Sequence, residues 1–284
     1  MRQALPPIPA PAVLRAGPDV TVTVFTVGWV AVRPAHREFG GPDALAFPAI
    51  LAGRGWTPWL PIHAFLVRHP ERTVLVDTGD AEHRPRGHYG CGSARQERFH
   101  RAFLRIEVPP EAALPRRLAA EGTDPRDVDT VVLTHLHSDH TGNLPAFTGA
   151  QVLVGDGEAD PFPGSTRCRL PGDGRTTATR WTDGPVAGFD RSHALTPDGT
   201  VRAVPLPGHT PGHQGLVVLG GDAPVVVAGD AAFSPGQLRR GRPPGIAADR
   251  PANLRTQRLL ASLADAGARV LLSHHAPAPG AAEP

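Results

Sequence analysis

The run Thr134-His135-Leu136-His137-Ser138-Asp139-His140 holds the densest group of chemically active side chains in the sequence. It follows the apolar stretch 131–133, which is typical of a buried strand. Imidazole and carboxylate groups bind zinc and other borderline first-row metal ions. Histidine is neither a good core filler nor a common turn residue, so three histidines within six positions are hard to attribute to packing. The run therefore predicts a metal site at a strand end.

Residues that can bind metal recur after three further predicted strands. His209 lies in the segment Pro-Gly-His-Thr-Pro-Gly-His at 207–213, Asp230 follows the apolar stretch 225–228, and His274 follows 270–272. Taken alone, an aspartate after a strand is usually a turn or cap residue, and the glycines and prolines around His209 are typical of a tight loop. Loops from one edge of a sheet can converge on one site. The shared position at strand ends therefore predicts that these side chains meet the 135–140 run.

Strands and hairpins must position these residues. Residues 21–27 alternate in the manner of a strand, and 64–67 with 74–76 predict a hairpin that ends on Asp77-Thr78-Gly79. The stretches 216–219 and 225–228 repeat this arrangement and end on Gly229-Asp230. The repetition suggests an internally duplicated αβ architecture with its site where the strands end.

The rest of the chain supplies helices, loops and an arm. Helices are expected over 110–121, with Pro115 in the first turn, and over 252–266, while Asp124-Pro125 predicts an N-cap followed by a proline. A strand is expected over 269–272. The glycine- and proline-rich stretch 33–59 predicts loops, and 156–200 predicts loops and short helices that face the substrate. Residues 1–18 predict an extended arm before a single domain, 19–284.

Composition indicates a globular, soluble and cytoplasmic protein. The 284 residues are 40% hydrophobic and 20% charged, which is ordinary for a globular domain. The net charge of +2 and the lack of a dense basic tract argue against nucleic acid as a partner. Neither a secretory signal nor an apolar run of membrane-spanning length is predicted. Cys91 and Cys168 show no repeated spacing, so they predict buried unpaired side chains rather than a disulfide framework.

The order and spacing of these motifs resemble the metallo-β-lactamase superfamily. The resemblance rests on the HxHxDH run at 135–140, the PGHTPGH segment at 207–213, the Gly-Asp pair at 229–230 and the Ser-His-His run at 273–275. It covers most of the chain from Thr21 to Ala276. It implies an α/β fold, a four-layer αβ/βα sandwich of two mixed sheets flanked by helices, with two divalent metal ions at one edge.

The resemblance also implies a role for each matching residue. His135, His137 and His209 would hold one metal, Asp139, His140 and His274 the other, and Asp230 would bridge them, with His275 as the alternative to His274. Asp77 and His213 would orient ligands, although a purely structural role is an equal alternative. Zinc fits this donor set, and iron, manganese or cobalt can occupy similar sites.

Such a site implies a hydrolase acting on a small molecule. A hydroxide between two divalent cations stays deprotonated near neutral pH and attacks an electrophilic centre. The catalytic residues would be Asp230 and Asp139, which would pass a proton to the leaving group. Ser138 is expected to be a spacer.

Within the superfamily the chain is similar to N-acyl-homoserine-lactone lactonases. The similarity rests on the blocks 65–79 and 207–214. One residue departs from that group, which has a tyrosine three residues after the bridging aspartate, where its hydroxyl binds the substrate carbonyl. Phe233 stands there, and the only tyrosine is Tyr89. This departure leaves the substrate open.

Several alternatives follow. The same scaffold serves organophosphate, aryl ester and thioester hydrolases, and a branch with a single iron resembles persulfide dioxygenases. A binding protein with an inactive site is disfavoured, because all seven ligand positions hold competent groups. The candidates for an apolar pocket wall, each with the core as the alternative, are Trp29, Trp56, Trp59, Phe162, Trp181, Phe189 and Phe233. The basic stretch 84–103 predicts a solvated helix, a homodimer contact or an anion-binding cap.

Overall fold

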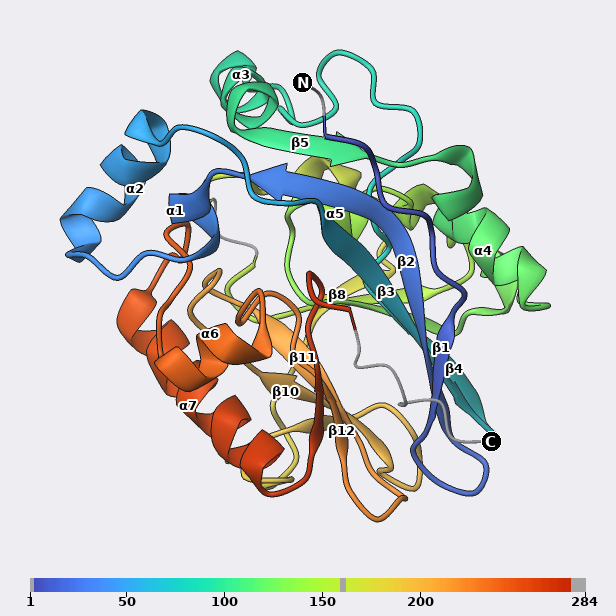
Figure 1. Ribbon diagram of the computed structural model, residues 1–284. Helices are drawn as coiled ribbons and strands as arrows, with labels where there is room; N and C mark the ends of the chain where they lie inside the picture. Colours follow the sequence, from blue (N-terminus) through green and yellow to red (C-terminus); the bar gives the residue numbers. More distant parts are fainter. Residues whose placement is uncertain (1–2, 159–161, 277–284) are drawn as a thin grey trace.

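Two β-sheets packed face to face form the centre of the molecule, with helices on both outer faces (Figure 1). The computed structural model describes residues 3–158 and 162–276. The predicted boundaries at residues 1 and 284, and residues 159–161 of the segment 156–200, lie outside the described residues. None of the described helices is both long and apolar enough to span a membrane.

The first sheet has eight strands and is mixed. Its order is β1-β2-β3-β4-β6-β7-β8, and β5 pairs with β2. The strands up to β4 pair antiparallel, whereas β4, β6, β7 and β8 run parallel. The bounds are β1 Ala12–Arg15, β2 Thr21–Val32, β3 Leu60–His69, β4 Arg72–Val76, β5 Leu104–Glu107, β6 Thr130–Leu133, β7 Gln151–Val154 and β8 Thr176–Ala178.

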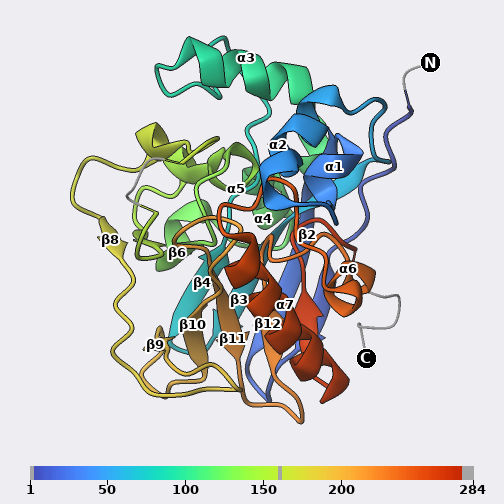
Figure 2. The same ribbon diagram turned by 90° about the vertical axis from the view of Figure 1, so that its left-hand side faces the viewer.

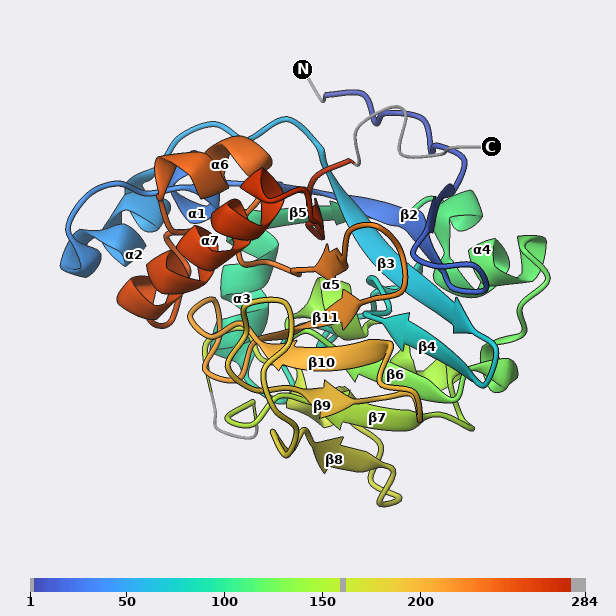
Figure 3. The same cartoon turned by 90° about the horizontal axis from the view of Figure 1, so that it is seen from below.

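The second sheet has five strands in the order β13-β12-β11-β10-β9. Only β12 and β13 pair parallel. Figure 3 shows β9, β10 and β11 lying alongside the strands of the first sheet. The bounds are β9 His193–Ala194, β10 Val201–Pro205, β11 Gln214–Val218, β12 Val225–Val227 and β13 Arg269–Leu271.

Alternation along the strands divides the apolar side chains among three cores. In β12, Val225 and Val227 face the core between the sheets, while Val226 faces the outer core under α7. In β4, Val74 and Val76 point into the core between the sheets, and Leu75 joins the outer core on the opposite face. Since side chains alternate with a period of two, each of these strands contributes side chains to two cores.

Helices cover both outer faces. In Figure 2, α7 lies over the second sheet beside β11 and β12, and its Leu260 is fully buried in the core formed there. Leu114 and Leu118 of α4 pack against the first sheet. The bounds are α1 Pro34–Arg37, α2 Asp43–Ala52, α3 Ala94–Phe103, η1 Pro110–Ala112, α4 Leu114–Ala120, η2 Pro125–Asp127, α5 Ser138–Thr141, η3 Leu144–Ala146, η4 Arg167–Arg169, α6 Pro235–Arg240 and α7 Arg250–Asp265. The four layers confirm the predicted fold class.

The N-terminal third differs from the sequence prediction. The strand predicted over 21–27 continues to Val32, because a bulge between Thr26 and Gly28 interrupts the simple alternation and hides its second half. The loops predicted over 33–59 are wrong in part, since α1 and α2 lie there. In α2 only Ala46 and Ile50 are buried, and Pro48 lies inside the helix, so the helical pattern is weak. Residues 12–15 of the predicted arm form β1 and pair with β2.

The prediction of unpaired cysteines is wrong. Cys91 and Cys168 form a disulfide, although 77 positions separate them in the sequence. The bond joins the loop before α3 to η4. The pairing depends on how the fold brings two loops together, which spacing does not reveal.

Candidate metal centre

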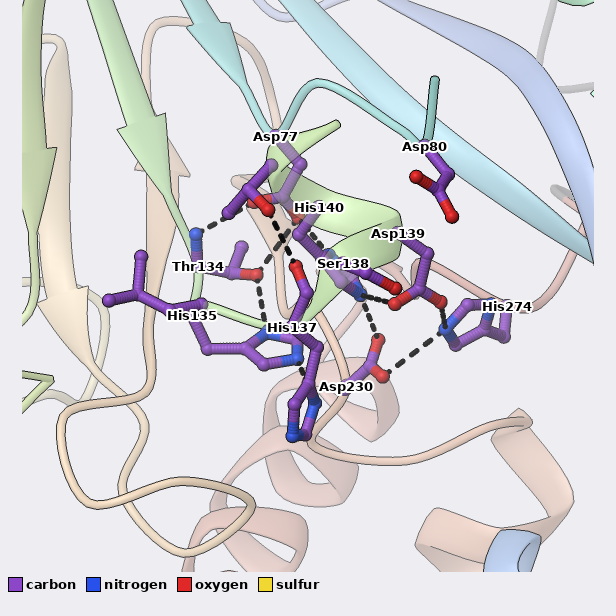
Figure 4. A network of polar contacts seen from close by, with 12 residues as sticks. Asp77, Asp80, Thr134, His135, His137, Ser138, Asp139, His140, Asp230 and His274 are labelled. Atoms are coloured by element: carbon purple, nitrogen blue, oxygen red, sulfur yellow. Dashed lines mark hydrogen bonds and ion pairs between the residues drawn. The ribbon is translucent and has the colours of Figure 1, made fainter. Parts of the chain in front are cut away.

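Four loops that follow strands carry seven ligand-type side chains into one cluster, and Figure 4 labels all of them except His209. The loop after β6 supplies His135 and His137, and α5 then turns Asp139 and His140 toward them. His209, Asp230 and His274 follow β10, β12 and β13. The predicted convergence of strand ends is thus what the fold shows, with His137 the most accessible member.

Three imidazoles form one side of the cluster. Nε2 of His135 lies 2.8 Å from Nδ1 of His137, and Nε2 of His209 lies 3.2 Å from the same atom. Burial lowers the pKa of all three rings, that of His135 and His209 well below the ordinary value. The rings are therefore neutral at pH 7, and their nitrogen lone pairs are available to a cation.

Two carboxylates and two histidines form the other side. Nε2 of His274 lies 3.2 Å from Asp230 and 3.5 Å from Asp139. Asp230 also lies 3.6 Å from His140 and 3.6 Å from His209, so it stands between the two halves. Burial raises the pKa of Asp230, but His274 and His140 outweigh burial and hold that pKa well below its ordinary value. The carboxylate is therefore charged.

The donor set fits two divalent cations. Nε2 of His140 and Oδ1 of Asp230 are buried and have no hydrogen-bond partner among the described residues. Such unpaired buried atoms are rare and costly, and a bound ion satisfies them. Three imidazoles with one carboxylate, beside two imidazoles with two carboxylates, are donors typical of zinc.

The two residues expected to orient ligands contact the cluster. Asp77 accepts hydrogen bonds from the backbone N–H of Thr134 at 2.8 Å and from Nδ1 of His140 at 2.8 Å, which leaves Nε2 of His140 facing the centre. Asp77 has a φ of 59°, a conformation that aspartate tolerates better than most residues. His213 donates from Nδ1 to the carbonyl of Leu206 and accepts from the backbone N–H of Asp230 at 3.1 Å.

His274, and not His275, faces the cluster. Nδ1 of His274 donates to the carbonyl of Pro61 at 2.8 Å, which turns Nε2 toward Asp230. His274 is 2% exposed, whereas His275 lies on the surface.

Comparisons with known proteins show the family of this chain. Residues 57–274 match the model of the metallo-beta-lactamase superfamily. The chain belongs to the metallo-β-lactamase superfamily. It is 31% identical to the N-acyl homoserine lactonase AttM of Azorhizobium caulinodans over 235 residues, 78% of this chain and 84% of that protein. It is 28% identical to AttM of Rhizobium radiobacter over 238 residues, 79% of this chain and 85% of the relative.

A solved structure shares the metallo-β-lactamase fold. It is an N-acyl homoserine lactone hydrolase with the product N-hexanoyl-L-homoserine bound at its catalytic metal centre. The TM-score is 0.69 at 20% identity, covering 89% of this chain and 92% of the other. The fold class implied by the sequence resemblance is therefore confirmed.

An apolar cavity opens onto the cluster of this superfamily member. Its walls combine His137, Asp139, His209, Asp230 and His274 with the apolar side chains of Val30, Val32, Phe99, Leu104, Phe233 and Ile246. Phe233 lies parallel to the ring of His274, with centroids 5.0 Å apart. Of the predicted pocket-wall aromatics, Phe233 lines this cavity and Phe162 lines the adjoining one. Trp29, Trp181 and Phe189 pack elsewhere, Phe189 and Trp181 in hydrophobic cores.

Glu158, which no sequence motif singles out, joins two of the loops that carry ligand-type residues. Its carboxylate accepts from the backbone N–H groups of Leu136 at 3.1 Å and Gly212 at 3.0 Å, and from the hydroxyl of Thr210. A single acidic residue in a glycine-rich turn gives no signal of this role, because its partners are distant in sequence.

The short helix α5 also has supports that the sequence did not reveal. The hydroxyl of Ser138, expected to be a spacer, hydrogen-bonds to Nε2 of His100 at 3.0 Å. Arg169 donates to the carbonyl of Ser138 at 2.9 Å and to Thr141 at 3.0 Å. The stretch 84–103 thus reaches the cluster through His100 on α3, a role that none of the predicted alternatives includes.

Proposed function

We propose that this chain is a lactonase that opens the ester bond of N-acyl-homoserine lactones at a centre of two divalent cations, zinc in the first instance. The observation that carries the proposal is a cluster of seven ligand-type side chains that opens into a largely apolar cavity. The AttM relatives support the same substrate class, because the matched region spans most of both chains.

The residues divide between two sites. His135, His137 and His209 would hold one cation, and Asp139, His140 and His274 the other, with Asp230 shared. Two cations in such a site supply an activated water at neutral pH and polarise a carbonyl oxygen. Asp77 accepts a hydrogen bond from His140, and His213 accepts one from the backbone N–H of Asp230, so each orients one ligand residue.

The chain's own groups position the substrate and move a proton. The apolar wall excludes water from the reacting bond and holds an acyl chain, while the polar floor faces the ester. Asp139 lies at the floor of the cavity, 3.5 Å from His274, and would carry a proton to the oxygen of the opening ring. No serine or cysteine nucleophile is required.

A substrate panel with metal analysis tests this function. Purified protein is loaded with zinc and assayed on N-acyl-homoserine lactones, aryl esters, aryl phosphotriesters and acyl thioesters. The expected result is about two zinc per chain and the highest kcat/KM on lactones. Turnover of phosphotriesters with lactones untouched contradicts the proposal. A single iron with oxygen consumption supports the dioxygenase alternative instead.

Three further parts of the proposal need their own measurements. The domain boundary at residue 19 is tested by limited proteolysis, and the homodimer by sedimentation. The cytoplasmic location is tested by thiol titration of freshly isolated protein, because the Cys91–Cys168 disulfide is more typical of an oxidising compartment.

A further inference from the structure

Two histidines that are not metal ligands line the cavity, His36 and His100, and His36 is the one without a hydrogen-bond partner at a buried ring nitrogen among the described residues. His36 lies on α1, is 7% exposed, and lines the same cavity as Asp139, Asp230 and Phe233. Its Nδ1 is buried without a hydrogen-bond partner among the described residues. A buried polar atom left without a partner calls for a functional explanation.

Ester hydrolysis makes a specific demand on this cavity. When water attacks the carbonyl carbon, the C=O bonding pair moves onto the oxygen, and a hydrogen-bond donor at that oxygen lowers the barrier. Phe233 offers no donor. The side-chain amide of Gln96 already donates hydrogen bonds to the carbonyls of Tyr89 and Ser165, at 2.8 and 3.0 Å. Nε2 of His100 is held by Ser138.

We propose that His36 donates a hydrogen bond to the carbonyl oxygen of the substrate and stabilises the oxyanion that forms there. The inference rests on the proposed ester hydrolysis. In the step, a bond forms between the water oxygen and the carbonyl carbon, and the carbonyl pair moves to the oxygen that His36 binds. The pair on that oxygen then re-forms the C=O bond as the ring C–O bond breaks, and the leaving oxygen takes the proton that Asp139 received from the water. His36 keeps its own proton throughout.

The surroundings hold His36 in place for this role. The backbone N–H of Gly245 donates to the carbonyl of His36 at 3.0 Å. Gln237 donates to the carbonyl of Arg37 at 2.9 Å and accepts from the backbone N–H of Phe233 at 2.7 Å. One side chain thus fixes the segment of His36 relative to Phe233, so both residues keep their positions in the cavity.

The charge state of His36 suits the role as well. Burial lowers the pKa of His36 to about 4, with His137 lowering it further. The ring is therefore neutral at pH 7 and carries one N–H, which it can donate without adding positive charge beside a cation site.

Variants of His36 test the proposal through the split between kcat and KM. His36→Phe keeps a ring of similar size but removes the donor, and His36→Gln keeps a donor. We expect kcat of His36→Phe on a lactone to fall about 100-fold with KM nearly unchanged, because the oxyanion exists only in the transition state. His36→Gln should retain at least a tenth of the wild-type kcat. Metal content and Tm should stay at wild-type values in both.

His193→Phe is the matched control. Nδ1 of His193 is also buried without a hydrogen-bond partner in the described part of the chain, but His193 lies on β9 and does not line the cavity. The control variant should leave kcat unchanged. A wild-type kcat in His36→Phe overturns the inference, as does an equal loss in His36→Phe and His36→Gln or a loss of metal in His36→Phe. A wild-type protein inactive on every ester of the panel contradicts the proposed function instead, so the two failures are distinguishable.

Discussion

The floor and the outer wall of the cavity are built in different ways. The floor consists of strand-end loops whose side chains are almost all buried, and several are fixed by hydrogen bonds to neighbouring backbone and side-chain atoms. The wall comes from β2, α1, α3, β5 and two loops, and α2, which lines the adjoining cavity, leaves Leu45, Phe47 and Leu51 about half exposed. Rigid strand ends suit chemistry that needs fixed distances, whereas helices with few buried contacts can change without harm to the fold. The floor should therefore determine the reaction, and the wall the substrate.

The largest effect is expected at the centre of the floor. Asp230→Asn removes the charge shared by both halves of the cluster, so it should lower both metal content and turnover. The loss in kcat/KM should exceed the about 10- to 100-fold typical of residues that only orient a ligand. Metal analysis and lactone assays measure both. Asp222→Asn, in the exposed turn between β11 and β12, should behave as wild type. Full activity in Asp230→Asn rules out the two-metal assignment.

A smaller effect is expected at Asp77, which orients a ligand residue and is not itself a ligand. Asp77→Asn weakens the acceptor for Nδ1 of His140 while it retains the side-chain shape. Metal affinity should fall about 10- to 100-fold. Competition with a chelator measures the affinity, and excess zinc should restore activity. If zinc does not restore activity, Asp77 has a role beyond holding His140.

A change in the wall should alter substrate preference alone. Phe99 lies between Phe47 and Phe103, with ring centroids 5.5 and 4.8 Å apart, and lines the cavity. Phe99→Ala should raise KM about 10-fold for long acyl chains and much less for short ones, because about 0.8 kcal/mol is lost per CH₂ left unburied. Metal content should not change. An equal change in KM for all chain lengths would show that Phe99 does not contact the acyl chain.

The smallest effect concerns the carboxylate that joins two ligand loops. Burial raises the pKa of Glu158 to about 7, above its ordinary value of 4.5. The carboxyl group of Glu158 therefore binds its proton more tightly in the folded protein than in the unfolded chain. The stability that this protonation contributes is lost as the pH rises from 4.5 to 7. Glu158→Gln should accordingly lose less stability relative to wild type at pH 7 than at pH 5. Urea unfolding at both pH values measures the difference. An equal loss at both would place the pKa of Glu158 outside this window.

Much of the floor and of the framework around it was predictable, because the sequence signals are local. The hairpins at β3–β4 and β11–β12, the proline in the first turn of α4 and the Asp124 cap follow from neighbouring residues. The wall was less predictable. The helix α2 has too few buried positions to show a period, and the bulge at Gly28 breaks the alternation of β2.

The sequence by itself determined which residues could bind metal, their order, and the strands that precede them, because ligand chemistry and strand periodicity are properties of short segments. Only the tertiary structure decided that His36 shares a cavity with Phe233, that Glu158 joins the loops of Leu136 and Gly212, and that Cys91 pairs with Cys168. These contacts join segments that are far apart along the chain. They arise from the pairing order of the strands and the packing of the layers, which residue spacing does not encode.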